Sequence, residues 1–168
     1  MEQKKYCCAL AREAQLEALF ALYVQRIAWM DAQGICQWNK TNYLGRYPLA
    51  YYAEHQRMGR LYVLQEAASG AIAGAMVLLE RDPRWPEGDQ GSAYYVHNLV
   101  TALAAPGAGR QLLREAEHIA QTHGKALVRL DCAVDNAPLN RYYEAQGYVP
   151  AGTCVDGPYA GVLREKRV

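Results

Sequence analysis

Apolar side chains recur through the first part of the chain with the period of an α-helix. From Glu13 they return every three to four residues until Gly34, a pattern typical of one long amphipathic helix that ends at a glycine. Residues 5–11, just upstream, form a short apolar run that predicts a first strand. The apolar helix positions are Leu16, Leu19, Phe20, Tyr23, Ile27 and Met30.

The rest of the chain alternates short apolar runs with helical periods. Pro48 opens a second helix, because proline is favoured in a first helical turn. Ser69-Gly70 between two apolar runs indicates a hairpin, and residues 82–91 are rich in turn formers and predict a loop. The expected helices are 48–58, 109–123 and 136–145, and the expected strands are 61–64, 71–79, 93–100, 126–132, 147–154 and a last one ending near Lys166.

This order of elements predicts one α+β domain over residues 1–168. The chain has 168 residues, the ordinary size of one domain, and shows no repeat, linker or low-complexity segment. A chain of this length buries enough surface to fold without a metal or a disulfide.

Composition and charge exclude several classes of function. The net charge is +1, half of the residues are hydrophobic and 21% are charged, as in an average soluble protein. We therefore expect neither nucleic-acid nor membrane binding. No run reaches the roughly 18 apolar residues of a membrane helix, and the apolar N-terminal stretch is too short for a signal peptide. Five scattered cysteines without a CxxC pair predict buried thiols in a reducing cytoplasm and no metal site.

A glycine-containing loop lies between a predicted strand and a predicted helix. Gly107 and Gly109 let the backbone approach a ligand and adopt dihedral angles that a Cβ would forbid. The first turn of the following helix offers unpaired N–H groups and the positive end of a dipole, which suits phosphates. Arg110, with Arg114 one turn on, adds positive charge. A helix entry that binds nothing is the alternative, because short glycine patterns are weak evidence.

The same loop has features of a dinucleotide-binding fingerprint. Gly107-x-Gly109 followed by Asp131 near the end of the next strand fits part of that motif. Position 112 is Leu, however, where the fingerprint has a third glycine, and no second mononucleotide-binding half follows. A nicotinamide or flavin enzyme is therefore not expected, and the lack of Lys-Ser or Lys-Thr after the glycines excludes a P-loop.

The elements in this order resemble the GNAT superfamily of acyl-CoA-dependent N-acyltransferases. The family's pyrophosphate loop reads Gln/Arg-x-x-Gly-x-Gly/Ala, and this chain has Ala104-Ala-Pro-Gly-Ala108-Gly109, so only the first polar residue differs. The resemblance implies a three-layer fold, with a mixed central sheet of about six to seven strands flanked by about four helices. It also implies acetyl-CoA as acyl donor, held by the amides of the loop with one side-chain contact fewer, and no metal.

A second stretch, residues 129–148, carries the resemblance further. In the family an Asn opens the helix here, a Tyr follows two turns later, and Gly with an aromatic residue ends it; Asn136, Tyr143 and Gly147-Tyr148 match. The family's Asn contacts the cofactor and its Tyr faces the sulfur, which makes Tyr143 the expected acid. Asn136 is also a good helix N-cap, and Tyr143 also suits core packing.

By resemblance, the strand before the glycine loop splays from its neighbour. The backbone of Leu99 and Thr101 then contacts the cofactor arm, and an N–H near Leu99 polarises the thioester carbonyl. His97, two residues before Leu99, shares its face of a regular strand and is a candidate base; a hydrogen-bonded structural histidine is the alternative. Many family members use a Glu through water, and Glu80 is the nearest acidic substitute.

Family members bind their acceptors with the first two helices and the last hairpin. Here these pieces are residues 29–52, the loop around Trp85 and the turn at Asp156, all near aromatic residues that can hold a cationic amine or form core or dimer surface. Gln37 and Trp38 lie in a loop and resemble a Gln-Trp pair in a branch of small GNAT enzymes. We expect a primary amine of a small molecule or peptide as acceptor, attacking the thioester directly. The sequence leaves open whether the acceptor is a polyamine, an amino acid, an antibiotic amine or a protein N-terminus. It also leaves open whether the chain forms a homodimer, and whether it is an acyl-CoA sensor without turnover.

Overall fold

The computed structural model describes residues 5–86 and 91–168. Over these residues the chain forms a seven-stranded sheet in the order β1-β2-β3-β4-β5-β7-β6. β4 and β5 are parallel, and the other neighbours are antiparallel. The strands are β1 Tyr6–Leu10, β2 Leu61–Glu66, β3 Ile72–Leu79, β4 Ala93–Thr101, β5 Leu127–Ala133, β6 Val149–Asp156 and β7 Tyr159–Arg167.

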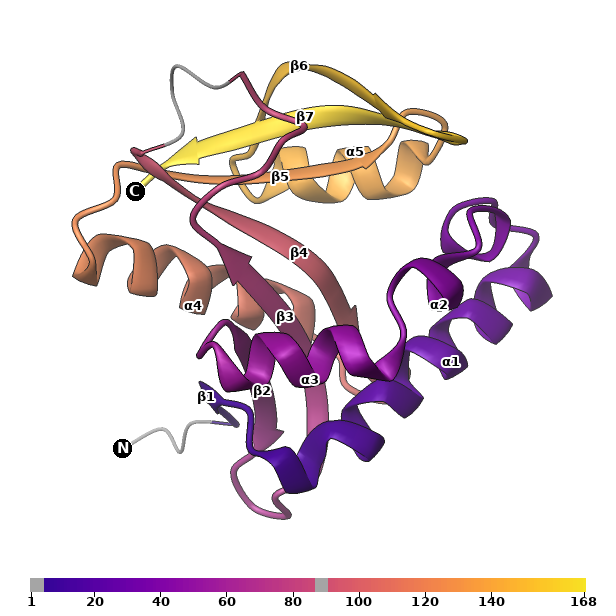
Figure 1. Cartoon of the computed structure of the whole chain (residues 1–168), viewed down its shortest axis with the longest axis vertical. Coiled ribbons are helices and arrows are strands. Elements are labelled where there is room, and N and C mark those ends of the chain that lie inside the picture. Colours follow the sequence, from indigo (N-terminus) through magenta and orange to yellow (C-terminus); the bar gives the residue numbers. More distant parts are fainter. Residues whose placement is uncertain (1–4, 87–90) are drawn as a thin grey trace.

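Helices cover both faces of the sheet, which confirms the expected α+β fold with a mixed central sheet. α1 ends where Gly34 adopts a left-handed conformation, and α3 begins directly after Pro48, as the sequence predicts. The one-turn helix α2 and two 3₁₀ turns, Glu13–Gln15 and Trp38–Lys40, were not expected. The helices are α1 Leu16–Gln33, α2 Tyr43–Arg46, α3 Leu49–Arg57, α4 Ala108–Thr122 and α5 Ala137–Ala145 (Figure 1).

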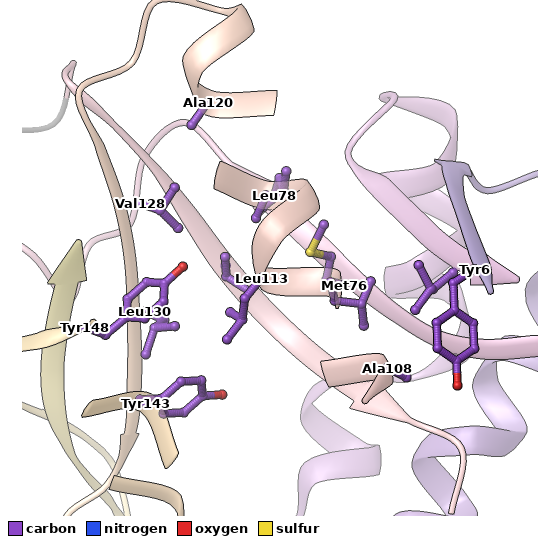
Figure 2. Packing of buried hydrophobic residues seen from close by; sticks show 14 of the residues in the cluster. Tyr6, Met76, Leu78, Ala108, Leu113, Ala120, Val128, Leu130, Tyr143 and Tyr148 are labelled. Atoms are coloured by element: carbon purple, nitrogen blue, oxygen red, sulfur yellow. The ribbon is translucent and has the colours of Figure 1, made fainter. Parts of the chain in front are cut away.

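Two main hydrophobic clusters hold these layers together. One joins the sheet to α4 and α5, and it places Leu113 of α4 opposite Tyr143 and Tyr148 (Figure 2). The other joins the sheet to α1, α2 and α3 and is rich in tyrosine. At the edge of the first cluster, the Tyr6 hydroxyl donates to the carbonyl oxygen of Pro106 at 3.1 Å. This bond ties the edge strand β1 to the glycine loop.

β4 and β5 separate along their length. Their parallel pairing covers Ala93–Tyr95 and Leu127–Arg129, although both strands continue beyond these residues in the described chain. Figure 1 shows the two strands diverging from one common end. The splay expected from the family resemblance is therefore present. Beyond the paired residues, the facing backbone edges of both strands have no strand partner among the described residues.

A β-bulge interrupts β4 just where it leaves β5. His97 pairs with Val77, but Val100 pairs with Ala75, so β4 has one extra residue, and Asn98 adopts a left-handed φ of 53°. Three tyrosines hold this residue. Tyr51 donates to the Asn98 Oδ1 atom at 2.9 Å, Asn98 donates to the Tyr43 hydroxyl at 2.5 Å, and Tyr23 donates to the Asn98 carbonyl oxygen at 2.5 Å.

The cysteines only partly follow the expectation of buried thiols. Cys132 and Cys154 are buried, Cys8 is half-buried, and Cys7 and Cys36 are exposed, so the expectation was wrong for the last two. Cys7 points outward from edge strand β1, and Cys36 lies in the loop after α1. All five are free thiols. Within the described ranges, no helix is long and apolar enough to cross a membrane, and no group of His, Cys, Asp or Glu is placed to hold a metal ion.

Candidate active site

A cavity of about 740 Å³ lies between the separated ends of β4 and β5. The structure brings almost all of the predicted site residues to its wall. They are Gln37, Trp38, His97, Leu99, Thr101, Gly107, Gly109, Arg110, Asn136 and Tyr143. Ala108 does not line it, because its side chain is fully buried where the first turn of α4 packs on the sheet, and its N–H donates to the carbonyl oxygen of Ala105 at 3.2 Å. The N–H of Ala108 is therefore not available to a ligand.

The two glycines of the loop are needed for different reasons. Gly107 is the N-cap of α4 and has φ +83°, a conformation that strains any residue with a Cβ. Gly109 is helical, but a Cβ there would lie 3.0 Å from the Tyr142 hydroxyl. In the described chain, the N–H groups of Gly109 and Arg110 have no backbone acceptor, as expected in a first helical turn. These amides point to an anion site.

Tyr143 lies on α5, and its ring belongs to the cluster between the sheet, α4 and α5 (Figure 2). The same residue lines the cavity. Its side chain is buried, and burial raises the pKa of its hydroxyl above the ordinary value. The phenol is therefore protonated at neutral pH, which a proton donor requires. Core packing and a place at the cavity wall coexist at this residue.

Asn136 connects the start of α5 to Gln37, which lies in the loop after α1. Its Oδ1 atom accepts from the Leu139 N–H at 3.2 Å and caps α5, as its residue type predicts. Its Nδ2 atom donates to Gln37 Oε1 at 2.5 Å. Gln37 is itself buried. Two residues assigned from the sequence to different ligands therefore contact each other, and the contact of Asn136 with a cofactor stays a prediction.

The expectation that His97 and Leu99 share one face of β4 is wrong. The bulge at Asn98 reverses the alternation of side chains between them. Val96 and Leu99 both pack in the cluster under α4 although they are three residues apart, whereas His97 pairs with Val77, which belongs to the cluster under α1 and α3. Both His97 and Leu99 still reach the cavity, because the separation from β5 exposes this part of the strand.

His97 is paired with an acid that the sequence did not single out. Its Nε2 atom lies 2.8 Å from Asp82 Oδ2, and the Asp82 side chain is almost fully buried. Burial alone would raise the pKa of this carboxyl, but the hydrogen bond and charge of His97, together with Arg84, outweigh burial and hold it below its ordinary value. Glu80, the acidic substitute expected from the sequence, is exposed and contacts Lys125 at 3.4 Å. Asp82 lies two residues after Glu80, at the start of the loop that follows β3.

Aromatic side chains from α1, α2 and the loop between them form the next part of the wall. Trp38 stacks on Tyr43 with ring centroids 4.4 Å apart and an angle of 16° between the planes. It also packs at the edge of the cluster under α1 and α3. Trp38 therefore packs in the core and also lines the cavity. Its position in a loop predicts only that it lines the cavity.

Arginine and aspartate side chains close the end of the cavity near the β6–β7 hairpin. Arg84 contacts Asp131 at 3.3 Å and Asp156 at 2.8 Å, and Arg46 contacts Asp156 at 2.7 Å. Tyr159 donates to Asp131 at 2.5 Å. Asp131, which fitted part of a dinucleotide fingerprint in the sequence, is therefore held by Arg84 and Tyr159. This end of the wall can bind a polar acceptor with groups of both signs.

The chain is similar to known acetyltransferases in sequence and in fold. The sequence model described as the Acetyltransferase (GNAT) family matches residues 31–148. The uncharacterized N-acetyltransferase YesJ of Bacillus subtilis is 26% identical, over 90% of this chain and 86% of that protein. A GNAT-family acetyltransferase structure from Listeria monocytogenes has a TM-score of 0.78 at 22% identity and covers 97% of this chain and 95% of that one. The PaiA N-acetyltransferase of Thermoplasma acidophilum, solved with coenzyme A, has a TM-score of 0.75 at 18% identity, covering 97% and 99%.

Proposed function

The chain belongs to the Acetyltransferase (GNAT) family, and we propose that it transfers an acetyl group from acetyl-CoA to a primary amine by direct attack. One observation carries this proposal. A single cavity between β4 and β5 is lined by the glycine loop, the buried Tyr143 and the Asp82-bound His97. An anion site, a proton donor and a proton acceptor thus face one space, as acyl transfer to an amine requires.

The wall fits acetyl-CoA, which supplies the acetyl group as a thioester. The free amides of Gly109 and Arg110 suit its pyrophosphate. The unpaired edge of β4 around Leu99 offers backbone groups to its arm and to the carbonyl oxygen, where one preorganised donor is typically worth about 3 kcal/mol. Gln37 and Trp38 would face the acceptor from the other side.

His97 would act as the base through its Nδ1 atom. The Asp82 carboxylate only accepts hydrogen bonds, so it keeps the imidazole proton on Nε2 and leaves the lone pair on Nδ1. As the amine nitrogen bonds to the carbonyl carbon and the C–S bond breaks, the amine proton passes to His97, directly or through water. Asp82 also stabilises the imidazolium that results.

Tyr143 would protonate the departing thiolate. Its buried hydroxyl stays protonated at neutral pH because burial raises its pKa. The sulfur then leaves as a thiol, and Tyr143 regains its proton from solvent. Tyr143 lines the cavity from α5 and His97 lines it from β4, so one group can take a proton while the other gives one.

A thiol-release assay with acetyl-CoA and a panel of amines tests this function. We expect release of free CoA that depends on the amine and saturates with acetyl-CoA. Thermal unfolding gives an independent measure, because a ligand at a hundred times its Kd adds about 2.7 kcal/mol to the unfolding free energy. Acetyl-CoA should raise the melting temperature and nicotinamide dinucleotides should not. Stabilisation without thiol release for any amine would instead identify an acyl-CoA sensor.

A further inference from the structure

Arg26 of α1 is a cation in the cavity wall that the sequence did not single out. Its Nη2 atom donates to the Thr101 carbonyl oxygen at 2.7 Å and to the Thr101 hydroxyl at 2.9 Å. Its guanidinium lies over the Trp29 ring, 4.9 Å from the centroid. The side chain is half-buried, and burial lowers its pKa, so the protein environment alone disfavours its charge.

Two other arginines of the same wall differ from Arg26 in one respect. Arg46 and Arg84 both form ion pairs with Asp156, and Arg84 also contacts Asp131. Arg26 has no carboxylate partner in residues 5–86 and 91–168, and its Nε and Nη1 atoms have no hydrogen-bond acceptor there. A half-buried guanidinium without a counter-ion is suited to binding an anion from outside the chain.

The position of Arg26 identifies the anion. Thr101, its partner, ends β4, and the Thr101 Cγ2 atom lies 3.8 Å from the point where a Cβ on Gly109 would sit. Arg26 is therefore one side chain away from the glycine loop. That loop has Ala104 where the family has Gln or Arg, and Pro106 contributes no N–H. The loop therefore lacks one hydrogen-bond donor to a phosphate. Arg26 of α1 lies beside it with N–H groups that have no acceptor among the described residues.

We propose that Arg26 binds the pyrophosphate of acetyl-CoA and supplies the contact that Ala104 lacks. This inference rests on the proposed function, since it assumes that acetyl-CoA occupies the cavity. The guanidinium keeps its bonds to Thr101 and offers Nε and Nη1 to phosphate oxygens. Phosphate recognition is then shared between α1 and the start of α4, on opposite faces of the sheet.

Arg26→Gln with donors of different phosphate content tests the proposal. The variant removes the charge and keeps a side-chain N–H. We expect at least tenfold weaker binding of acetyl-CoA and of 3′-dephospho-acetyl-CoA, both of which carry the pyrophosphate. Binding of S-acetylpantetheine, which has no phosphate, should change less than twofold. Ligand titration by calorimetry, or by chemical shift for weak binding, measures all three.

Matched variants separate this role from a structural one. Arg46→Gln removes a cation that is paired with Asp156 in the same wall, and acetyl-CoA binding should change less than twofold. Arg26→Lys keeps the charge, and its affinity for acetyl-CoA should fall less than threefold. This variant can be measured even if Arg26→Gln does not fold. Equal losses for all three donors would make Arg26 only a clamp on β4, and unchanged affinity would remove it from the site. Wild-type protein that does not bind acetyl-CoA would overturn the proposed function itself.

Discussion

The two halves of the cavity differ in whether backbone or side-chain atoms line them. The half at the glycine loop is made mostly of backbone: the amides of Gly109 and Arg110 and the open edge of β4. The half near the β6–β7 hairpin is made of side chains, in which Arg84 and Asp131 contact each other. A backbone-built site is damaged by adding atoms, and a side-chain-built site by removing them. Each half should therefore respond to the opposite kind of substitution.

The largest effect should follow from removing the imidazole of His97. His97→Gln keeps an N–H for Asp82 but has no basic nitrogen, so kcat/KM should fall by about 10²–10⁴-fold. Thiol release with a saturating amine measures it. His55→Gln is the matched control, because His55 does not line the cavity and its ring packs edge-on against Tyr51. Equal kcat/KM in wild type and His97→Gln would leave His97 a structural residue.

The next effect should come from Tyr143, a side chain within the backbone-built half. Tyr143→Phe removes the proton donor and should lower kcat by about 10–100-fold, at or below the low end of general acid catalysis, because a thiol already leaves tolerably as its anion. Cofactor affinity and melting temperature should stay nearly unchanged. Because the pKa of Tyr143 is raised, its ionisation should cause no loss of activity as the pH rises to about 10, the ordinary pKa of tyrosine.

Tyr148→Phe is the control for Tyr143. The Tyr148 hydroxyl donates to Glu117 at 3.0 Å, and its ring belongs to the same cluster without lining the cavity (Figure 2). This variant should lose stability and keep its kcat. A large loss of stability in Tyr143→Phe, or equal kcat values where chemistry limits turnover, would contradict the acid role.

Adding atoms to the backbone-built half should weaken cofactor binding. Gly109→Val places a branched side chain beside the pyrophosphate site and 3.0 Å from the Tyr142 hydroxyl, so acetyl-CoA should bind at least about tenfold more weakly. The fold should persist, because Gly109 has ordinary helical angles and Tyr142 is partly exposed. Calorimetric titration against wild type measures the loss. Unchanged affinity would remove this part of the loop from the site.

The order of elements and the glycine loop could be predicted because their causes are local. Helical periods, Gly34, Pro48 and the glycines all act within a few residues of where they stand. The bulge at Asn98 could not, since it is held by tyrosines from three helices far away in the sequence. That bulge is also why the shared face of His97 and Leu99 was predicted wrongly.

Contacts between side chains far apart in the sequence could not be predicted either. Asp82 becomes the partner of His97 only because the loop after β3 folds back over β4. Arg26 reaches Thr101 only because α1 crosses the end of that strand. The burial of Ala108 follows from the packing of α4, which places every fourth residue of the helix on the sheet. None of these contacts has a local signature, and they concentrate where the cavity is formed.

The smallest effect should come from removing a side chain from the backbone-built half. Arg110 is exposed and forms no ion pair in the described part of the chain, so its contact with a phosphate is screened by water and salt. Arg110→Ala should weaken acetyl-CoA binding by about two- to fivefold, less than Arg26→Gln, whose guanidinium is half-buried. The Arg110 effect should also shrink as salt is raised from low to about 0.15 M, where the Debye length falls to about 8 Å. Calorimetry at two salt concentrations on both variants checks this order. A loss for Arg110→Ala that equals or exceeds the loss for Gly109→Val would mean that the loop binds through its side chain, and the contrast between the two halves would fail.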